Sequence, residues 1–197
     1  MIGRVLTSFL GEDTSQHRVV AVVRGGFPLL YGIQNVYLDH VTDGAARSVI
    51  LGIHGAGLPL NDPLLIVNSD QIVDFDLTQF LAGAGDASMV VFPVHGGEPR
   101  WSYARIEWGY ITKVAEKQAI SEWATAGVYY WRRTYDFVRS AGRMISLDDR
   151  VNNEFYVAPT YNYALAEGML VTPFFVEESQ FHDLGTPAAL EEYLGRR

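Results

Sequence analysis

The order of apolar and polar residues predicts strands that alternate with helices through the first half of the chain. Short runs rich in valine, isoleucine and leucine predict strands, and the predicted strands cover residues 17–23, 33–39, 63–68 and 87–94. The run at 63–68 has no polar side and predicts a strand buried on both faces. Helical patterns lie between these strands, at residues 42–52, where Thr42 or Asp43 can cap the first turn, and at residues 76–83.

The second half begins with a β-hairpin pattern. Residues 103–108 and 110–117 alternate in character on either side of Gly109, which predicts a turn at Trp108-Gly109. The remaining patterns predict strands at 125–133 and 169–176, and helices at 134–145, 154–167 and 186–197. The last helix has Pro187 in its first turn.

Strands separated by helices predict the α/β class. We expect an open, mostly parallel twisted sheet with helices on both faces. The chain of 197 residues is 48% hydrophobic, enough for one substantial core, and we expect a single domain over residues 1–197.

Composition and charge narrow the function. The net charge is −8 and no run rich in Lys and Arg is present, which argues against nucleic acid as a partner. The absence of cysteine excludes disulfides, thiolate metal sites and a cysteine nucleophile. No apolar run approaches the roughly 18 to 20 residues that span a bilayer, and residues 1–10 lack the basic start of a signal peptide. We therefore expect no membrane insertion and a cytoplasmic location.

Three carboxylates follow the strand predicted at 63–68. In an open α/β sheet, ligands bind beyond the carboxyl ends of the strands, so Asp70 is a candidate ligand for Mg²⁺, which prefers oxygen ligands. The alternative is that Asp70 caps a turn. Asp74 and Asp76 fit turn and helix-cap roles better than metal binding.

Four segments resemble the sugar-phosphate nucleotidylyltransferases of the glucose-1-phosphate thymidylyltransferase type, particularly branches linked to capsule or surface-polysaccharide synthesis. The segments are LLIVNSDQIVDFDL, WSYARIEWGYITKVAEKQAISEWATAGVYYWRR, VNNEFYVAPTYNYAL and FHDLGTPAALEEYL, in the family's order. The resemblance covers nearly the whole chain. It implies a nucleotide-diphospho-sugar transferase fold, which is GT-A-like, and Mg²⁺ as cofactor.

The resemblance also assigns catalytic residues. Asp70 and Asp183 match the family's two metal-binding aspartates. Glu116-Lys117 matches a glutamate-lysine pair in which the lysine faces the sugar phosphate. A turn role for Asp183 and a solvated strand end for Lys117 are the alternatives without the family.

The remaining matches are substrate-binding residues. The small residues of VTDGAARSV, namely Thr42, Gly44, Ala45 and Ala46, match a loop and helix start near the nucleotide base. The residues that match the sugar side or end the buried strand are Asn68, Gly127 and Glu154. An ordinary capped helix at 42–52 and a helix-capping role for Glu154 are the alternatives.

Two departures from the family pattern stand out. Gln118 follows Lys117 where the family has proline. The family also begins with a strand and a glycine-rich loop, G-x-G-x-R, ahead of a helix that this chain enters at residues 1–10, so the sequence reads as N-terminally truncated. Because such a loop would cradle the triphosphate, we expect a weakened hold on that group.

Three functions follow from these patterns. The first is a nucleotidyltransferase that joins a nucleoside triphosphate (NTP) and a phosphorylated sugar or small metabolite, releasing pyrophosphate. The second is a non-catalytic nucleotide- or sugar-binding or regulatory subunit. The third is a glycosyltransferase that uses a nucleotide sugar, which NSDQ in place of D-x-D makes less favoured. Homo-oligomerisation is compatible with each.

Overall fold

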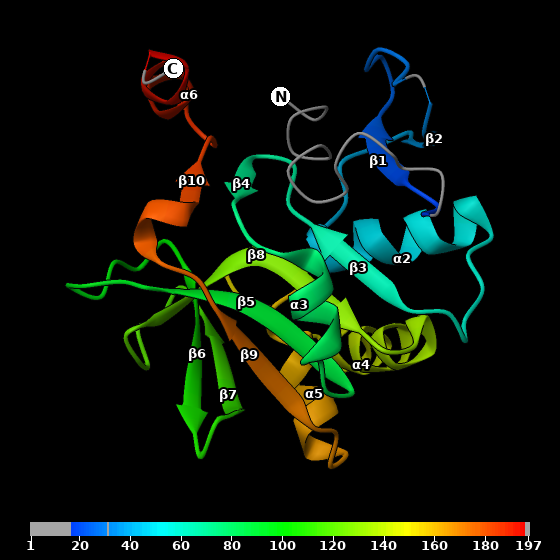
Figure 1. Cartoon of the computed structure of the whole chain (residues 1–197). Coiled ribbons are helices and arrows are strands. Elements are labelled where there is room, and N and C mark those ends of the chain that lie inside the picture. Colours follow the sequence, from blue (N-terminus) through cyan, green and yellow to red (C-terminus); the bar gives the residue numbers. More distant parts are fainter. Residues whose placement is uncertain (1–16, 31, 196–197) are drawn as a thin grey trace.

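The structure is a computed structural model that describes residues 17–30 and 32–195, so the helix expected over residues 1–10 lies outside the described part (Figure 1). The strands are β1 (Val20–Arg24), β2 (Gln34–Leu38), β3 (Leu64–Val67), β4 (Gln71–Val73), β5 (Ala87–Pro93), β6 (Ser102–Glu107), β7 (Tyr110–Glu116), β8 (Trp123–Trp131), β9 (Val171–Phe175) and β10 (Phe181–Asp183). The helices are α2 (Ala45–Ala56), α3 (Leu77–Ala82), α4 (Thr134–Ser146), α5 (Thr160–Ala166) and α6 (Pro187–Gly195), with a 3₁₀ turn η1 (Glu178–Gln180).

The central sheet is mixed, which corrects the expectation of a mostly parallel sheet. Its strand order is β7-β6-β8-β5-β9. The strand β3 also pairs with β8, along residues 128–131. Within this sheet only β5 and β9 pair in parallel, and the other pairs are antiparallel. A smaller parallel pair joins β1 to β2, and an antiparallel pair joins β4 to β10.

The antiparallel β6–β7 hairpin joins this sheet, and β8 is inserted between β3 and β5. The half of β8 formed by Val128–Trp131 lies between β3 and β5 and runs antiparallel to both. The alternation of strands and helices correctly gives β3 and β5 the same direction. It does not reveal that a strand from later in the chain separates them.

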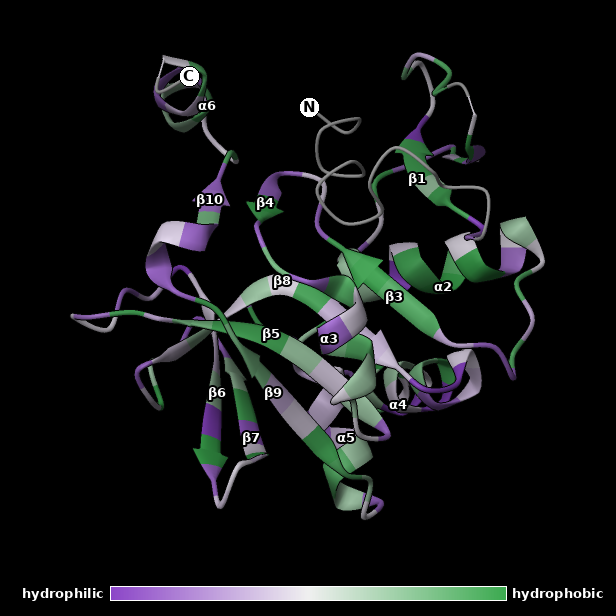
Figure 2. Cartoon of the chain, in the orientation of Figure 1, coloured by the Kyte–Doolittle hydropathy of each residue, from purple (hydrophilic) through white to green (hydrophobic). Residues whose placement is uncertain are grey.

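Side chains of the central strands alternate between two hydrophobic cores. In β5, Met89 and Val91 face the first core, which α2, α4 and α5 cover, whereas Val90 and Phe92 face the second core with Phe80 of α3. Helices therefore cover both faces of the sheet, as expected. Figure 2 shows hydrophobic residues along β3 and much of β5, as burial on both faces requires.

Local signals placed the hairpin correctly. Trp108 and Gly109 both have positive φ, 57° and 83°, in a two-residue turn between the paired residues Glu107 and Tyr110. Consecutive left-handed residues suit the twist of a tight hairpin. The turn projects away from the rest of the sheet (Figure 1).

Two helix starts differ from expectation. Neither Thr42 nor Asp43 caps α2, because Gly44 is the N-cap and makes no side-chain cap bond. The Thr42 hydroxyl instead hydrogen-bonds with the Ser48 hydroxyl at 2.7 Å. The helix expected over 154–167 begins only at Thr160, after the N-cap Pro159, because a proline inside a helix would clash with the carbonyl four residues earlier.

The expected cap of α3 is confirmed. The Asp76 carboxylate accepts a hydrogen bond from the Gln79 amide at 3.0 Å, so Asp76 is the N-cap of α3. Within residues 17–30 and 32–195, no helix is long and apolar enough to cross a membrane.

Candidate functional site

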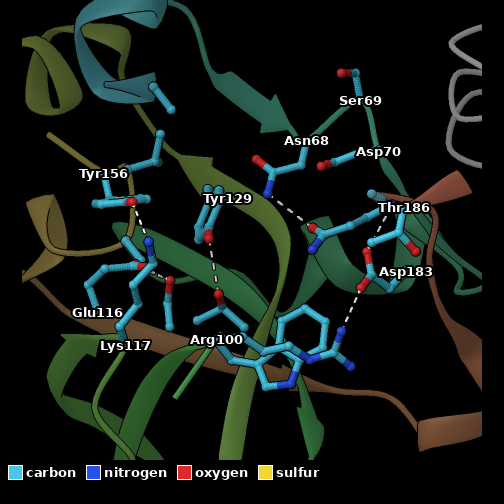
Figure 3. Close-up of a pocket in the computed structure, with 18 residues that line it drawn as sticks. Asn68, Ser69, Asp70, Arg100, Glu116, Lys117, Tyr129, Tyr156, Asp183 and Thr186 are labelled. Carbon is cyan, nitrogen blue, oxygen red and sulfur yellow. Dashed lines mark hydrogen bonds and ion pairs between the residues drawn. The ribbon is translucent and has the colours of Figure 1, made fainter. Parts of the chain in front are cut away.

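A cavity of about 550 Å³ opens where β3 ends, and most of the residues matched to the family surround it (Figure 3). Its walls and floor come from six stretches of chain, which are the start of α2, the segment after β3, residues 100–102 with the end of β7, β8, residues 156–158, and the end of β10 with the segment that follows it. The lining side chains used below are Asn68, Asp70, Gln71, Arg100, Trp101, Ser102, Glu116, Lys117, Thr125, Tyr129, Tyr156, Asp183 and Thr186. Lys117 and Tyr156 lie on one side and Asp70 and Asp183 on the other (Figure 3).

Pairing of β4 with β10 brings Asp70 and Asp183 together, although 112 positions separate them in the chain. Asp183 pairs with Gln71, and the Leu184 amide donates to the Asp70 carbonyl at 2.7 Å. A methyl group placed on Gly185 would lie 3.2 Å from Asp183 Oδ1 and 3.3 Å from Asp70 Oδ2. The two carboxylate oxygens therefore lie no more than about 6.5 Å apart, the sum of those distances.

The carboxylates of Asp70 and Asp183 form a donor set that fits one shared Mg²⁺ ion. Mg²⁺ is usually held by one or two carboxylates, with water and phosphate oxygens completing its shell. Among the described residues, no group of three or more His, Asp and Glu side chains could cage a metal, so an ion here would need substrate oxygens. The exposed Asp70 carboxylate forms no ion pair within the described part of the chain.

Asp183 already has a cationic partner, Arg100. Arg100 Nη1 lies 2.9 Å from Asp183 Oδ2, and its guanidinium carbon lies 4.1 Å from the centre of the Trp101 ring. The Glu98 carboxylate accepts a further bond from Arg100 Nε at 2.8 Å. Arg100 therefore satisfies one oxygen of Asp183, while the other oxygen faces Gly185 and accepts its amide at 3.0 Å.

Lys117 directly follows the strand β7, on the opposite side of the cavity. Its backbone has φ of 55°, and Nζ donates to the Tyr156 hydroxyl at 2.6 Å. That hydrogen bond is the main cause that raises the pKa of Lys117, so the ammonium stays charged beyond the usual range. Lys117 is thus a fixed positive charge at the cavity wall.

Hydroxyl groups line the floor between these two sides. Ser102 donates to the Glu116 carboxylate, and the Thr125 and Tyr129 hydroxyls lie 3.0 Å apart. Burial raises the pKa of Glu116, although Ser102 and Lys117 oppose the rise. Burial also raises the pKa of Tyr129, which therefore stays protonated. Such a floor offers donors and acceptors suited to a polyhydroxylated ligand.

Of the four residues expected near a nucleotide base, only Ala45 lines the cavity. Ala46 is fully buried with Met144 and Phe155. A methyl group on Gly44 would lie 2.4 Å from the backbone N and O of Phe155, so this position needs glycine for packing. Thr42, Gly44 and Ala46 therefore fix the start of α2 behind the cavity wall.

Gly127 in β8 lets two cavity side chains approach the backbone closely. A methyl group there would lie 1.8 Å from Gln71 Oε1 and 2.7 Å from Asn68 Nδ2, and its φ is 71°. Asn68 donates to Gln71 at 3.0 Å, so these two cavity side chains lie against the bare backbone of β8. Glycine is required here for both space and conformation.

Glu154 stands at the edge of the site. It is exposed, follows the turn residues Asn152 and Asn153, and forms an isolated bridge with Val151. Its carboxylate is close enough to the Tyr156 hydroxyl to help raise the pKa of that phenol, after burial as the main cause. Glu154 therefore reaches the cavity through Tyr156 and is not a helix cap.

The sequence patterns missed several cavity residues, among them Arg100, Tyr129 and Tyr156. Arg100 lies in a loop, and its partner Asp183 is 83 positions away. Tyr156 had a usable signal, since extended residues two apart point to the same side, and Glu154 was already singled out. Reading residues 154–167 as one helix hid that relation.

A family model described as nucleotidyl transferase matches residues 29–194. The bifunctional protein GlmU of Wolinella succinogenes is 28% identical over 171 residues, which cover 81% of this chain and 37% of that protein. The chain thus spans little more than a third of the length of this curated relative.

Solved structures share the fold. A nucleoside-diphosphate-sugar pyrophosphorylase from Vibrio cholerae RC9 has a TM-score of 0.82 at 21% identity, covering 100% of this chain and 87% of that chain. The inositol-1-phosphate CTP transferase from T. maritima has a TM-score of 0.61 at 14% identity, covering 90% of this chain and 74% of that chain. At these identities the likeness is one of fold.

Proposed function

The chain belongs to the nucleotidyl transferase family, and from this premise we propose that it joins an NTP to a sugar phosphate. The products are a nucleoside-diphosphate sugar and pyrophosphate. The proposal agrees with the names of the similar proteins, a bifunctional GlmU and a nucleoside-diphosphate-sugar pyrophosphorylase. We further propose that the product is a precursor for capsule or surface polysaccharide, made in the cytoplasm.

The observation that carries the proposal is the division of charge across one cavity. The carboxylates of Asp70 and Asp183 lie on one side, and the ammonium of Lys117 lies on the other. Cation-bridged phosphates suit the acidic side, and a lone phosphate dianion suits the lysine. The hydroxyl floor between them suits the sugar ring.

The reaction needs no nucleophile from the protein. A phosphate oxygen of the sugar phosphate forms a bond to the α-phosphorus of the NTP, and the bond from that phosphorus to the bridging oxygen breaks. Pyrophosphate leaves with the electron pair. The chain's part is to hold the two substrates in line and to offset charge, which is how phosphoryl-transfer sites work in general.

Each wall has a distinct task in this scheme. Lys117 binds and orients the attacking phosphate, and Glu116 with the floor hydroxyls orients the sugar. Asp70 and Asp183 would hold Mg²⁺, which neutralises phosphate charge when bound. Arg100, paired with Asp183, lies where it can contact phosphate oxygens.

Pyrophosphate release tests the proposal. The chain is incubated with Mg²⁺, each NTP in turn and a panel of sugar phosphates, and pyrophosphate is measured. Asp70→Asn should lower the rate and weaken the dependence on Mg²⁺, whereas Asp74→Asn, which changes an exposed carboxylate outside the cavity lining, should leave both close to wild type. Binding of a sugar phosphate without pyrophosphate release for any pair would favour a binding subunit, and equal losses in the two variants would remove Asp70 from the site.

A further inference from the structure

We propose that Tyr156 is a positioning residue that holds the Lys117 ammonium in place to receive the phosphate of the sugar phosphate. The proposal rests on the function proposed above and adds a residue and a role to it. The sequence patterns do not single out Tyr156, and its importance follows from its contacts inside the cavity.

Two contacts tie Lys117 to Tyr156. Lys117 Nζ donates to the Tyr156 hydroxyl at 2.6 Å, and the same nitrogen lies 4.7 Å from the centre of the ring. Both side chains line the cavity. No other hydrogen bond from Nζ is found within the described residues, so this phenol sets the position of the ammonium.

Tyr156 is itself held in place through the backbone beside it. Its hydroxyl accepts the hydrogen bond from Lys117 and lies near the Glu154 carboxylate, which helps to raise the pKa of the phenol. The backbone of the preceding Phe155 is fixed to the loop ahead of α2, because its amide donates to the Asp43 carbonyl at 2.7 Å and its carbonyl accepts the Ala46 amide at 2.9 Å. Phe155 is also almost fully buried.

The tight turn before this segment completes the support. Asn152 and Asn153 both have positive φ, 49° and 63°, and the amides and carbonyls of Val151 and Glu154 bond to each other across the turn. Asparagine adopts this conformation more readily than most residues. Tyr156 therefore projects from a short, well-bonded loop.

A held lysine matters because a lysine side chain is long and flexible. Ordering a free lysine on a phosphate costs rotamer entropy, whereas a preorganised ammonium has already lost it. Loss of this preorganisation should weaken binding of the sugar phosphate about tenfold, which corresponds to about 1.4 kcal/mol. The affinity for the sugar phosphate should fall, and the affinity for the NTP should not change.

The test compares Tyr156→Phe, which keeps the ring and removes the hydroxyl, with Tyr163→Phe. Tyr163 also donates its hydroxyl to a carboxylate, that of Asp149 at 2.7 Å, but lies outside the cavity lining. Binding of glucose 1-phosphate and of inorganic phosphate is measured by titration calorimetry, and the KM values for sugar phosphate and NTP are measured separately. Urea unfolding of each variant checks that the fold is intact.

We expect Tyr156→Phe to weaken binding of glucose 1-phosphate about tenfold and to raise its KM by a similar factor, with the KM of the NTP unchanged. The loss of binding at high pH should also begin at a lower pH, because the phenol raises the pKa of Lys117. The other titratable groups that face the ammonium are Glu116 and Glu154, and both remain in this variant. Tyr163→Phe should match wild type in each measurement.

A second variant, Glu154→Gln, keeps the tyrosine and removes a carboxylate that raises the pKa of Lys117. The loss of binding at high pH should therefore begin at a lower pH than in the wild type, by a smaller shift than in Tyr156→Phe. If Tyr156→Phe and Glu154→Gln both bind glucose 1-phosphate as wild type does, with the same pH profile, the positioning role is wrong and the proposed function stands. If the wild-type chain binds neither probe and releases no pyrophosphate, the proposed function fails, and the role of Tyr156 with it.

Discussion

Gly127→Ala should destabilise the protein and deform the cavity wall, because the new methyl group meets both a conformational and a steric obstacle. The φ of 71° lies in the left-handed region, which costs a residue with a Cβ about 1–2 kcal/mol. The methyl group would lie 1.8 Å from Gln71 Oε1 and 2.7 Å from Asn68 Nδ2. These side chains must move, and losing the hydrogen bond between them costs about 1 kcal/mol more.

The expected loss in the free energy of unfolding is therefore about 2–3 kcal/mol, the two contributions together. Two other glycines separate the contributions. Gly57 also has positive φ, 61°, but nothing lies within 4 Å of an added methyl group, so Gly57→Ala should show the conformational cost alone. Gly142 lies inside α4 without positive φ or contacts, so Gly142→Ala should be neutral or stabilising, by up to about 1 kcal/mol.

Urea unfolding at pH 7, followed by circular dichroism, measures all three variants. Equal slopes against urea would license direct comparison of their free energies. If Gly127→Ala costs no more than Gly57→Ala, the contact with Gln71 and Asn68 contributes nothing, and the reasoning about this wall is wrong. The displaced side chains should also weaken sugar-phosphate binding in Gly127→Ala and not in the other two variants.

Three further outcomes are expected. Asp76→Ala should lower the free energy of unfolding by about 1 kcal/mol in urea titrations, because α3 loses its N-cap, and Asp76→Asn should lose much less. Phe80→Ala should lower the free energy of unfolding by about 3–5 kcal/mol, because the ring is almost fully buried. Leu81→Ala, at the exposed neighbouring position, should lower it by no more than about 0.5 kcal/mol. Glu116→Gln should raise the free energy of unfolding at pH 7, because burial raises the pKa of Glu116 above 4.5 and disfavours its charge in the fold. That gain should shrink as the pH falls through the raised pKa of folded Glu116 and should be lost below 4.5, and a gain independent of pH would refute the assigned cause.

Features coded by neighbouring residues were predictable from the sequence. The turn at Trp108-Gly109 and the cap at Asp76 both follow from a few adjacent side chains and their backbone preferences. Helix positions followed from periodicity, except at the start of α2, which begins after Gly44, and at the start of α5, which Pro159 delays.

Features that depend on distant pairing were not predictable. No local pattern in β3 or β5 shows that β8 lies between them. The same limit applies to the site, since Arg100 meets Asp183 and Lys117 meets Tyr156 only in the folded chain. The position after a buried strand indicated Asp70, but only resemblance to a family joined it to Asp183.

The insertion of β8 between β3 and β5 also constrains the order in which the protein can fold during synthesis. Within the described residues, the only sheet partner of β3 is β8, so residues 64–67 must wait for residues 128–131 to leave the ribosome. Until then the hydrophobic strands β3 and β5 both have unpaired edges, and unpaired edges promote aggregation. Pairing of β3 with β8 closes a long loop, and such long-range pairing is slow. We therefore expect a nascent chain that ends before β8 to depend on chaperones, and release of β8 to be the step at which β3 first pairs within the sheet.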